Sequence, residues 1–184
     1  MRAFVAIEVD EPIRRALAGL IEELNRPRQP VKWVAAENIH LTLKFLGDVA
    51  DARVTESAQV VRACAQGTGP FALTVRGTGA FPDPERPRVI FAGAEDERGA
   101  AHELARRLEE QMVALGVERE ERPFQCHVTL GRVREPRSLP ALAAKMAASS
   151  AREFGRMAVT QVTLFESKLT PQGPIYRAVE RIAL

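Results

Sequence analysis

Two short stretches carry the pattern from which the fold of this chain can be worked out. Residues 38–47 read NIHLTLKFLG and residues 124–132 read FQCHVTLGR, so each stretch holds a histidine and a threonine separated by one apolar residue. The 184 residues contain only three histidines, and two of them stand in this context. A single pair of this kind has no value as a motif, whereas two matching copies indicate a duplicated unit whose halves share a task.

The sequence that flanks the two motifs repeats as well. A strand-like apolar run precedes each motif at a similar distance, at 4–9 and at 89–93, and an amphipathic helix pattern follows each run. Asp10 is the predicted N-cap of the first helix and Asp96 that of the second. After each motif a further helix and strand are predicted, at 54–65 and 71–75 in the first copy and at 139–148 and 157–165 in the second.

These patterns predict an α+β fold of two pseudo-symmetric lobes that enclose a central cleft. The proline-rich stretch at 81–87 marks a boundary, which divides the single domain 1–184 into lobes of roughly residues 1–84 and 85–184. Apolar and polar residues alternate in the strands, so each lobe is expected to hold a mostly antiparallel sheet with helices. The Pro-Gln-Gly-Pro turn within 168–184 predicts a closing hairpin or a crossing strand.

Composition excludes several broad classes of protein. Apolar residues make up 46% and charged residues 27% of the chain, which is typical of a globular domain. Charged residues interrupt every apolar stretch too early for a membrane span or a secretory signal, so we expect a cytoplasmic protein without membrane contact. We also expect a monomer. The net charge of +2 provides no bulk basic field, so a nucleic acid would be held by a few local groups. Cys64 and Cys126 are expected to be free thiols, with a disulfide between them as the alternative.

Each motif places its polar side chains on one face of a strand. Residues two apart in a strand point to the same side, so His40 and Thr42 share one face, and His127 and Thr129 share another. The apolar residues that face the core are then Leu41, Leu43, Val128 and Leu130. A metal shared by the two histidines is the nearest alternative, but zinc needs three or four ligands. No Asp, Glu or Cys shares either face, because alternation turns Cys126 away, and we expect neither a metal nor another cofactor.

Two equivalent imidazoles that face each other suit an in-line displacement at phosphorus. The entering and leaving oxygens then lie on opposite sides of one atom. One neutral histidine can take a proton from the attacking water while its protonated partner gives a proton to the departing oxygen, and a pKa of about 6.5 suits histidine to both tasks. Thr42 and Thr129 would donate hydrogen bonds to the non-bridging oxygens, where negative charge accumulates.

With these residues in view, the chain resembles a known family, the 2H phosphoesterases, and within it the bacterial and archaeal RNA 2′,3′-cyclic phosphodiesterases, also called 2′-5′ RNA ligases. The segments that carry the resemblance are 2–7, 31–47, 77–82, 124–132 and 164–169. The resemblance implies a two-lobed α+β fold and hydrolysis of a terminal 2′,3′-cyclic phosphate to a 2′-phosphate without metal. The expected partner is an RNA with such an end or a small cyclic nucleotide. Cys126 departs from the family pattern, which often has proline at this position.

The resemblance also implies roles for individual residues. His40 would be the general acid, His127 the general base, and Arg132 a phosphate-binding side chain. Strict alternation places Arg132 on the face away from His127, so a bulge or kink at Gly131 would have to turn it back. An exposed arginine at the end of the strand is the alternative.

Four further residues carry weaker signals. By alternation Lys44 shares a face with the first motif, where it either adds positive charge to the site or is solvated. For Phe45, filling the core is favoured over stacking on a base, and Trp33 is expected to pack against its neighbours. His102 lies on a predicted amphipathic helix and is expected at the surface.

Two other functions remain open on the sequence alone. The same histidines could catalyse the reverse reaction, the ligation of RNA halves through a 2′-5′ bond, and only product analysis separates the two. A protein of another class would bind RNA ends without catalysis. The presence of both histidines speaks against this second alternative.

Overall fold

The computed structural model describes all 184 residues, which form nine strands, four α-helices and one short 3-10 helix. Their bounds in chain order are β1 Arg2–Glu8, α1 Glu11–Leu24, β2 Val31–Trp33, η1 Ala36–Asn38, β3 His40–Asp48, α2 Asp51–Gln66, β4 Phe71–Phe81, β5 Val89–Glu95, α3 Ala100–Ala114, β6 His127–Val133, α4 Pro140–Ala148, β7 Glu153–Val159, β8 Gln161–Thr170 and β9 Gly173–Ala183. The run β1-α1-β3-α2-β4 is followed by a similar run, β5-α3-β6-α4-β7, before the final β8 and β9.

The strands form two sheets, and every pairing within them is antiparallel. The first sheet has the strand order β3-β1-β8-β9, and the second has the order β2-β6-β5-β4-β7. The strands β8 and β9 form the hairpin predicted from the turn at 171–174. The predicted α+β class with two mostly antiparallel sheets is confirmed.

The two sheets do not follow the two halves of the chain, and this part of our expectation is wrong. Strand β4 comes from the first half but lies in the second sheet, between β5 and β7. Strands β8 and β9 come from the second half but lie in the first sheet, beside β1. Each half therefore gives a strand to the other sheet, so a division into residues 1–84 and 85–184 separates strands that pair. Long-range pairing of this kind leaves no trace in local periodicity.

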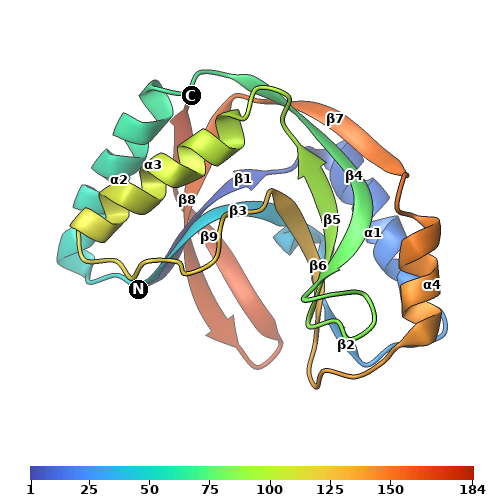
Figure 1. The fold of residues 1–184 in the computed structure, drawn as a ribbon. Coiled ribbons are helices and arrows are strands. Elements are labelled where there is room, and N and C mark those ends of the chain that lie inside the picture. Colours follow the sequence, from blue (N-terminus) through green and yellow to red (C-terminus); the bar gives the residue numbers. More distant parts are fainter.

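The helices cover the outer sides of the sheets and leave the inner sides facing each other. Figure 1 shows α2 and α3 together on one side of the molecule and α1 and α4 on the other, with the strands between them. Helix α3 packs against β3 and α2 against β9, while α1 packs against β7 and α4 against β4. The main core lies between these helices and the sheets, and a smaller apolar cluster of Phe4, Ala6 and Phe165 lies apart from it on the first sheet.

The predicted helix starts are half right. Asp10 caps α1 as expected, because its Oδ1 accepts a hydrogen bond from the Ile13 N–H at 3.1 Å. Helix α3 begins at Ala100 and follows Gly99, so Asp96 is not its N-cap residue. The Asp96 carboxylate still accepts a hydrogen bond from the Ala101 N–H at 2.8 Å, so it satisfies one of the free donors of the first turn from a position further upstream.

Two further expectations concern the strand predicted at 157–165 and the membrane span. The single strand predicted at 157–165 is in fact the end of β7 and the start of β8, which belong to different sheets. None of the helices combines the length and the apolar character that crossing a membrane requires.

Candidate active site

A β-bulge in each motif strand decides which side chains reach the inner faces. On β3, Ala6 pairs with Thr42 and Val5 with Lys44, so Leu43 is an extra residue in the ladder. On β6, Phe91 pairs with Thr129 and Ile90 with Gly131, so Leu130 is the equivalent extra residue. After an extra residue the inward and outward positions exchange. The two bulges therefore lie at the same place in the two copies.

Before the bulges, the histidines and threonines lie as alternation predicts. His40, Thr42, His127 and Thr129 are half-buried on the inner faces. The intervening apolar side chains are buried in the main core: Leu41, Leu43, Val128 and Leu130. Each sheet thus presents one imidazole and one hydroxyl to the space between the sheets.

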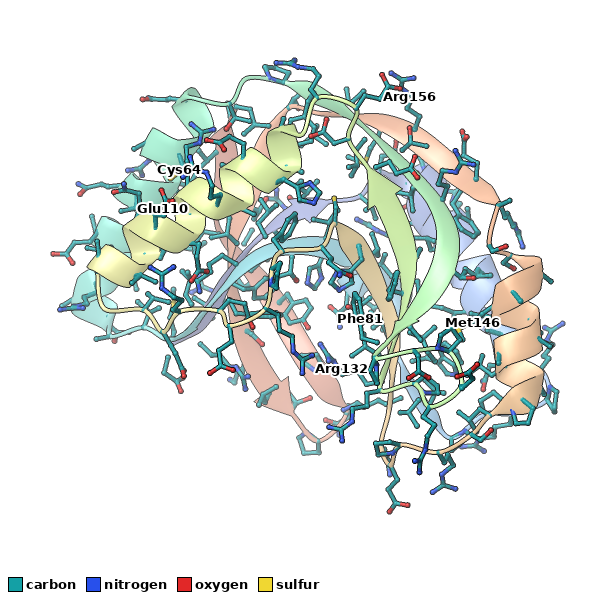
Figure 2. The ribbon with its side chains drawn as sticks, viewed as in Figure 1. Cys64, Phe81, Glu110, Arg132, Met146 and Arg156 are labelled. Carbon is teal, nitrogen blue, oxygen red and sulfur yellow. The ribbon has the colours of Figure 1, made fainter.

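After the bulge on β6, Arg132 returns to the inner face. It pairs with Val89, one position from the buried Ile90, so it lies on the same side as Thr129 and His127. The kink that the resemblance required is present, although the extra residue is Leu130 rather than Gly131. Figure 2 shows Arg132 and Phe81 in the region between the two sheets.

After the bulge on β3, two residues lie opposite to our expectation. Lys44 is turned away from the histidine and is 5% exposed, and its Nζ lies 2.7 Å from Glu109 Oε2 and donates a hydrogen bond to the Glu118 carbonyl. Phe45 pairs with Phe4 on the inner face and is 54% exposed, so it does not fill the core. The sequence of β3 alone does not predict the orientation of Lys44 or of Phe45, because a bulge is defined by pairing with the partner strand.

The two motif strands have different neighbours, which explains why a glycine in one copy corresponds to a lysine in the other. Strand β6 is flanked by β2, and a Cβ at Gly131 would lie 2.6 Å from Val31 Cγ1 and 2.8 Å from Trp33 Cε3. Only glycine permits this close approach. Strand β3 is an edge strand, so the equivalent Lys44 has room for a long side chain. Trp33 packs against β6, as predicted.

Each histidine is oriented by a hydrogen bond to the backbone carbonyl two residues upstream. Nδ1 of His40 lies 2.7 Å from the Asn38 carbonyl oxygen, and Nδ1 of His127 lies 2.7 Å from the Gln125 carbonyl oxygen. A carbonyl oxygen can only accept, so each Nδ1 carries a hydrogen and Nε2 is the nitrogen that can exchange a proton. The His40 Nε2 lies 3.0 Å from Thr42 Oγ1.

Aromatic rings pack around each imidazole. His40 lies 4.9 Å from the Phe4 ring and meets the Tyr176 ring edge-on at 5.3 Å. His127 meets Phe81 at 5.1 Å and Phe91 at 5.4 Å, both nearly edge-on. Local sequence patterns do not predict these rings around the histidines, since the rings come from strands distant in the chain, although Tyr176 is the only tyrosine.

Burial lowers the pKa of both histidines below the ordinary value. For His40, burial is opposed by the hydrogen bond to the Asn38 carbonyl, which favours the charged imidazole. For His127, burial is opposed in the same way by Gln125, and the nearby positive charge of Arg132 lowers the pKa further. Burial raises the pKa of the Tyr176 hydroxyl, and the positive charge of Arg132 partly opposes this by lowering it. Arg132 on the second sheet thus lies close to the aromatic group around His40 on the first.

The histidine faces contain no set of side chains that could hold a metal. No three His, Cys, Asp or Glu side chains converge anywhere in the chain. Cys64 and Cys126 are free thiols, which confirms that expectation. Burial raises the pKa of Cys126 to about 12, so the residue next to His127 stays a neutral thiol. His102 is exposed on α3, as predicted.

Neither of two surface pockets is lined by a motif histidine. One of about 440 Å³ is lined by Trp33 and by residues of the loops 25–30 and 134–137. Another of about 860 Å³ is lined by 44–50 and 115–122, with the exposed Phe45 among its lining residues. The paired chemistry of the two motifs is thus found on the inner faces rather than in either pocket.

The chain is similar to one family along nearly its whole length. A family model described as LigT-like phosphoesterase matches residues 7–91 and 93–176. The RNA 2′,3′-cyclic phosphodiesterase of Methanothermobacter thermautotrophicus is 38% identical over 180 residues, which are 98% of this chain and 97% of that protein. The protein with this name in Archaeoglobus fulgidus is 39% identical over 180 residues, which are 96% of this chain and 97% of that protein.

Solved structures share the fold over the same length. The protein TT0787 of Thermus thermophilus superimposes with a TM-score of 0.81 at 32% identity, covering 100% of this chain and 98% of that one. Escherichia coli LigT in complex with 3′-AMP superimposes with a TM-score of 0.81 at 28% identity, covering 100% of this chain and 97% of that one. Both similarities extend across the two sheets and the inner faces between them.

Proposed function

Because the chain belongs to the LigT-like phosphoesterase family, the 2H phosphoesterases, we propose that it hydrolyses the 2′,3′-cyclic phosphate at the end of an RNA or on a small cyclic nucleotide, leaving a 2′-phosphate. The observation that carries the proposal is the repeated site: two imidazoles, each oriented through Nδ1 by a backbone carbonyl two residues upstream, with a threonine beside each. The reaction needs one proton acceptor and one proton donor on opposite sides of phosphorus.

In the proposed reaction His127 is the general base. Its Nε2 takes a proton from a water molecule whose oxygen forms the new bond to phosphorus. This task needs a neutral imidazole, and both burial and the neighbouring Arg132 favour the neutral form of His127. The charge of Arg132 is the feature that supports giving this task to His127.

His40 is the general acid on the other side of phosphorus. As the bond between phosphorus and O3′ breaks, the protonated Nε2 of His40 gives its proton to O3′, which leaves as a hydroxyl. The hydrogen bond from Nδ1 to the Asn38 carbonyl favours the charged imidazole of His40 against the effect of burial, and a bound phosphate anion would favour it further.

Thr42, Thr129 and Arg132 would bind the non-bridging oxygens of the cyclic phosphate. All three lie on the inner faces beside a histidine, and each can donate a hydrogen bond. Charge on these oxygens grows toward the transition state, so the donors would lower the barrier to the reaction. The chain's own donors would therefore supply the charge stabilisation, and no metal or other cofactor takes part in the proposal.

Incubation with an oligonucleotide that ends in a 2′,3′-cyclic phosphate, in the presence of a chelator, tests the proposal. The expected product is the 2′-phosphate, formed at a rate that chelation leaves unchanged. Loss of activity on chelation and its stoichiometric return with a divalent ion would overturn the two-histidine mechanism. An RNA-end binding protein would bind this oligonucleotide without any turnover, and product analysis on RNA halves would reveal 2′-5′ ligation.

A leaving group that needs no proton tests the order of the two histidines. With a nitrophenyl phosphodiester as substrate, His40→Ala should recover much of the rate it loses on RNA, because nitrophenolate leaves unassisted. His127→Ala should recover nothing, since water still needs a base. Recovery by His127→Ala alone would reverse the two roles.

A further inference from the structure

A second cation lies directly beside Arg132 on the neighbouring strand. In the antiparallel pair β2 and β6, Lys32 is the partner of Arg132, with Val31 opposite Val133 and Trp33 opposite Gly131. Partners in such a pair have Cα atoms about 5 Å apart and side chains on the same face. The charged ends of Lys32 and Arg132 can therefore reach the same small region.

Lys32 lies on the inner face of the second sheet. The side chains of its neighbours Val31 and Trp33 pack against the main core, and both lie beside the position that a Cβ of Gly131 would occupy. Val31 and Trp33 therefore point to the core side of the sheet. Lys32, between them in the strand, points to the other side and is exposed. This is the side on which Arg132, Thr129 and His127 lie.

Neither cation is neutralised within the protein. Other cations of the chain are paired with acidic side chains. Lys44 on β3 forms an ion pair with Glu109, and Arg137 forms one with Glu135. Lys32 and Arg132 form no ion pair with a carboxylate and donate no side-chain hydrogen bond to another residue. Like charges directly opposite each other in a sheet destabilise it. An anion from outside the protein would remove that repulsion.

The position of the pair indicates which anion. Arg132 is already assigned to the cyclic phosphate, and Lys32 lies further out, at the edge of the sheet, because β2 is its last strand. The next negative charge along an RNA whose end lies between the histidines is the phosphodiester on the 5′ side of the terminal nucleotide. A lysine binds such a group as a point charge.

We propose that Lys32 binds the phosphodiester on the 5′ side of the terminal nucleotide, so that the enzyme favours an RNA end over a free cyclic mononucleotide. This inference rests on the proposed function and names the substrate class of the same site. The competing explanation is that Lys32 only protects an edge strand from pairing with another chain, a common use of lysine. That role predicts no effect on the choice of substrate.

A matched pair of small substrates isolates the phosphodiester. One is a 2′,3′-cyclic mononucleotide with a free 5′-hydroxyl, and the other is the same nucleotide with a 5′-methylphosphate, which adds one phosphodiester charge and no base. The measured quantity is the ratio of their kcat/KM values. The wild-type protein should favour the methylphosphate substrate about tenfold, as expected for a hydrogen bond between charged groups. The ratio should fall with salt with a slope of about −0.7 on logarithmic axes.

Variants then connect this ratio to Lys32. Lys32→Ala should bring the ratio close to one and remove its salt dependence, while Lys32→Arg should retain most of it. Lys168→Ala is the matched control, because Lys168 on β8 is also exposed and has no ion pair. It should show the wild-type ratio. A wild-type ratio in Lys32→Ala, or a ratio of one in the wild-type protein, would overturn the inference. Failure to hydrolyse either substrate would instead overturn the proposed function.

Discussion

In each histidine, a hydrogen bond made by Nδ1 leaves Nε2 as the nitrogen that can exchange a proton. In each copy the backbone carbonyl two residues upstream holds Nδ1, and Nε2 is left on the inner face. The donor of that bond is the ring and the acceptor is main chain, so the upstream side chain does not matter. Asn38 and Gln125 differ, yet the two imidazoles are oriented in the same way.

The pH dependence of the reaction follows from burial of both imidazoles. Burial lowers the pKa of His40 and of His127 below about 6.5, and the proposed mechanism requires one of them neutral and the other charged in the free enzyme. That form is most abundant between the two lowered values, so kcat/KM should be bell-shaped, peak below pH 6.5 and fall above it. A bound phosphate anion favours the charged ring, so the profile of kcat should lie at higher pH. A maximum of kcat/KM above about pH 7.5 would contradict this prediction.

Arg132 should affect both the rate and the position of the acid limb of this profile. Arg132→Ala removes a donor to the transition state, and we expect turnover to fall by about a hundredfold. It also removes the positive charge that lowers the pKa of His127, although burial remains the main cause. NMR titration of His127 should therefore show a raised pKa in Arg132→Ala and the wild-type pKa in Arg132→Lys. Near-native turnover of Arg132→Ala would show that the cyclic phosphate is bound elsewhere.

At the scale of elements, the bulges on β3 and β6 give the two copies different properties. The bulge turns Arg132 toward the site in one copy and Phe45 in the other, so one inner face presents a cation and the other an aromatic ring. It also turns Lys44 into the core, where Lys44 binds Glu109 and the Glu118 carbonyl. Glu109 in turn accepts a hydrogen bond from the Glu120 N–H. The strand of one histidine thus holds the loop that leads to the other.

Loss of this buried ion pair should destabilise the protein. Lys44→Met leaves the Glu109 carboxylate with little solvent and without its partner, and the free energy of unfolding should fall by about 3 kcal/mol in chemical denaturation. Arg106→Met is the control, since the Arg106 pairs with Glu103 and Glu110 are exposed to solvent and its loss should change stability far less than the loss of Lys44. Equal effects of the two substitutions would show that Lys44 does not hold the loop.

The same bulges mark the limit of what the sequence predicts about the site. Alternation is enough to place His40, Thr42, His127 and Thr129, because these residues precede the extra residue in each strand. It places Lys44 on the wrong face, since the extra residue exists only relative to a partner strand. The arginine was assigned to the site through the family resemblance alone. Lys32 was missed because its importance depends on its cross-strand neighbour.

At the scale of the whole molecule, the two sheets depend on each other. The class of fold, four helices and the repeated order of elements could be predicted from periodicity, but the exchange of β4 and β8 could not. Strand β1 lies between β3 and β8, and β5 lies between β6 and β4, so each half leaves a central strand with only one neighbour of its own. Neither half holds a complete sheet.

Separate halves should therefore fail to fold. Residues 1–84 contain β4 without β5 or β7, and β1 without β8, and their apolar faces would stay exposed. We expect this fragment to be largely unfolded by circular dichroism, and the full chain to unfold in one cooperative transition. Residues 85–184 should behave in the same way as 1–84. A cooperative thermal transition of either fragment alone would show that the halves are independent lobes.

The exchanged strands also affect how the protein is made. A ribosome releases β1 first, but the segment 2–6 pairs with 163–167, which emerges almost at the end of translation. Tyr176, which packs against His40, emerges later still. A nascent chain therefore carries His40 on an unfinished sheet for most of its synthesis. A product that terminates before residue 161 lacks both β8 and β9, so only β3 and β1 of its first sheet are present.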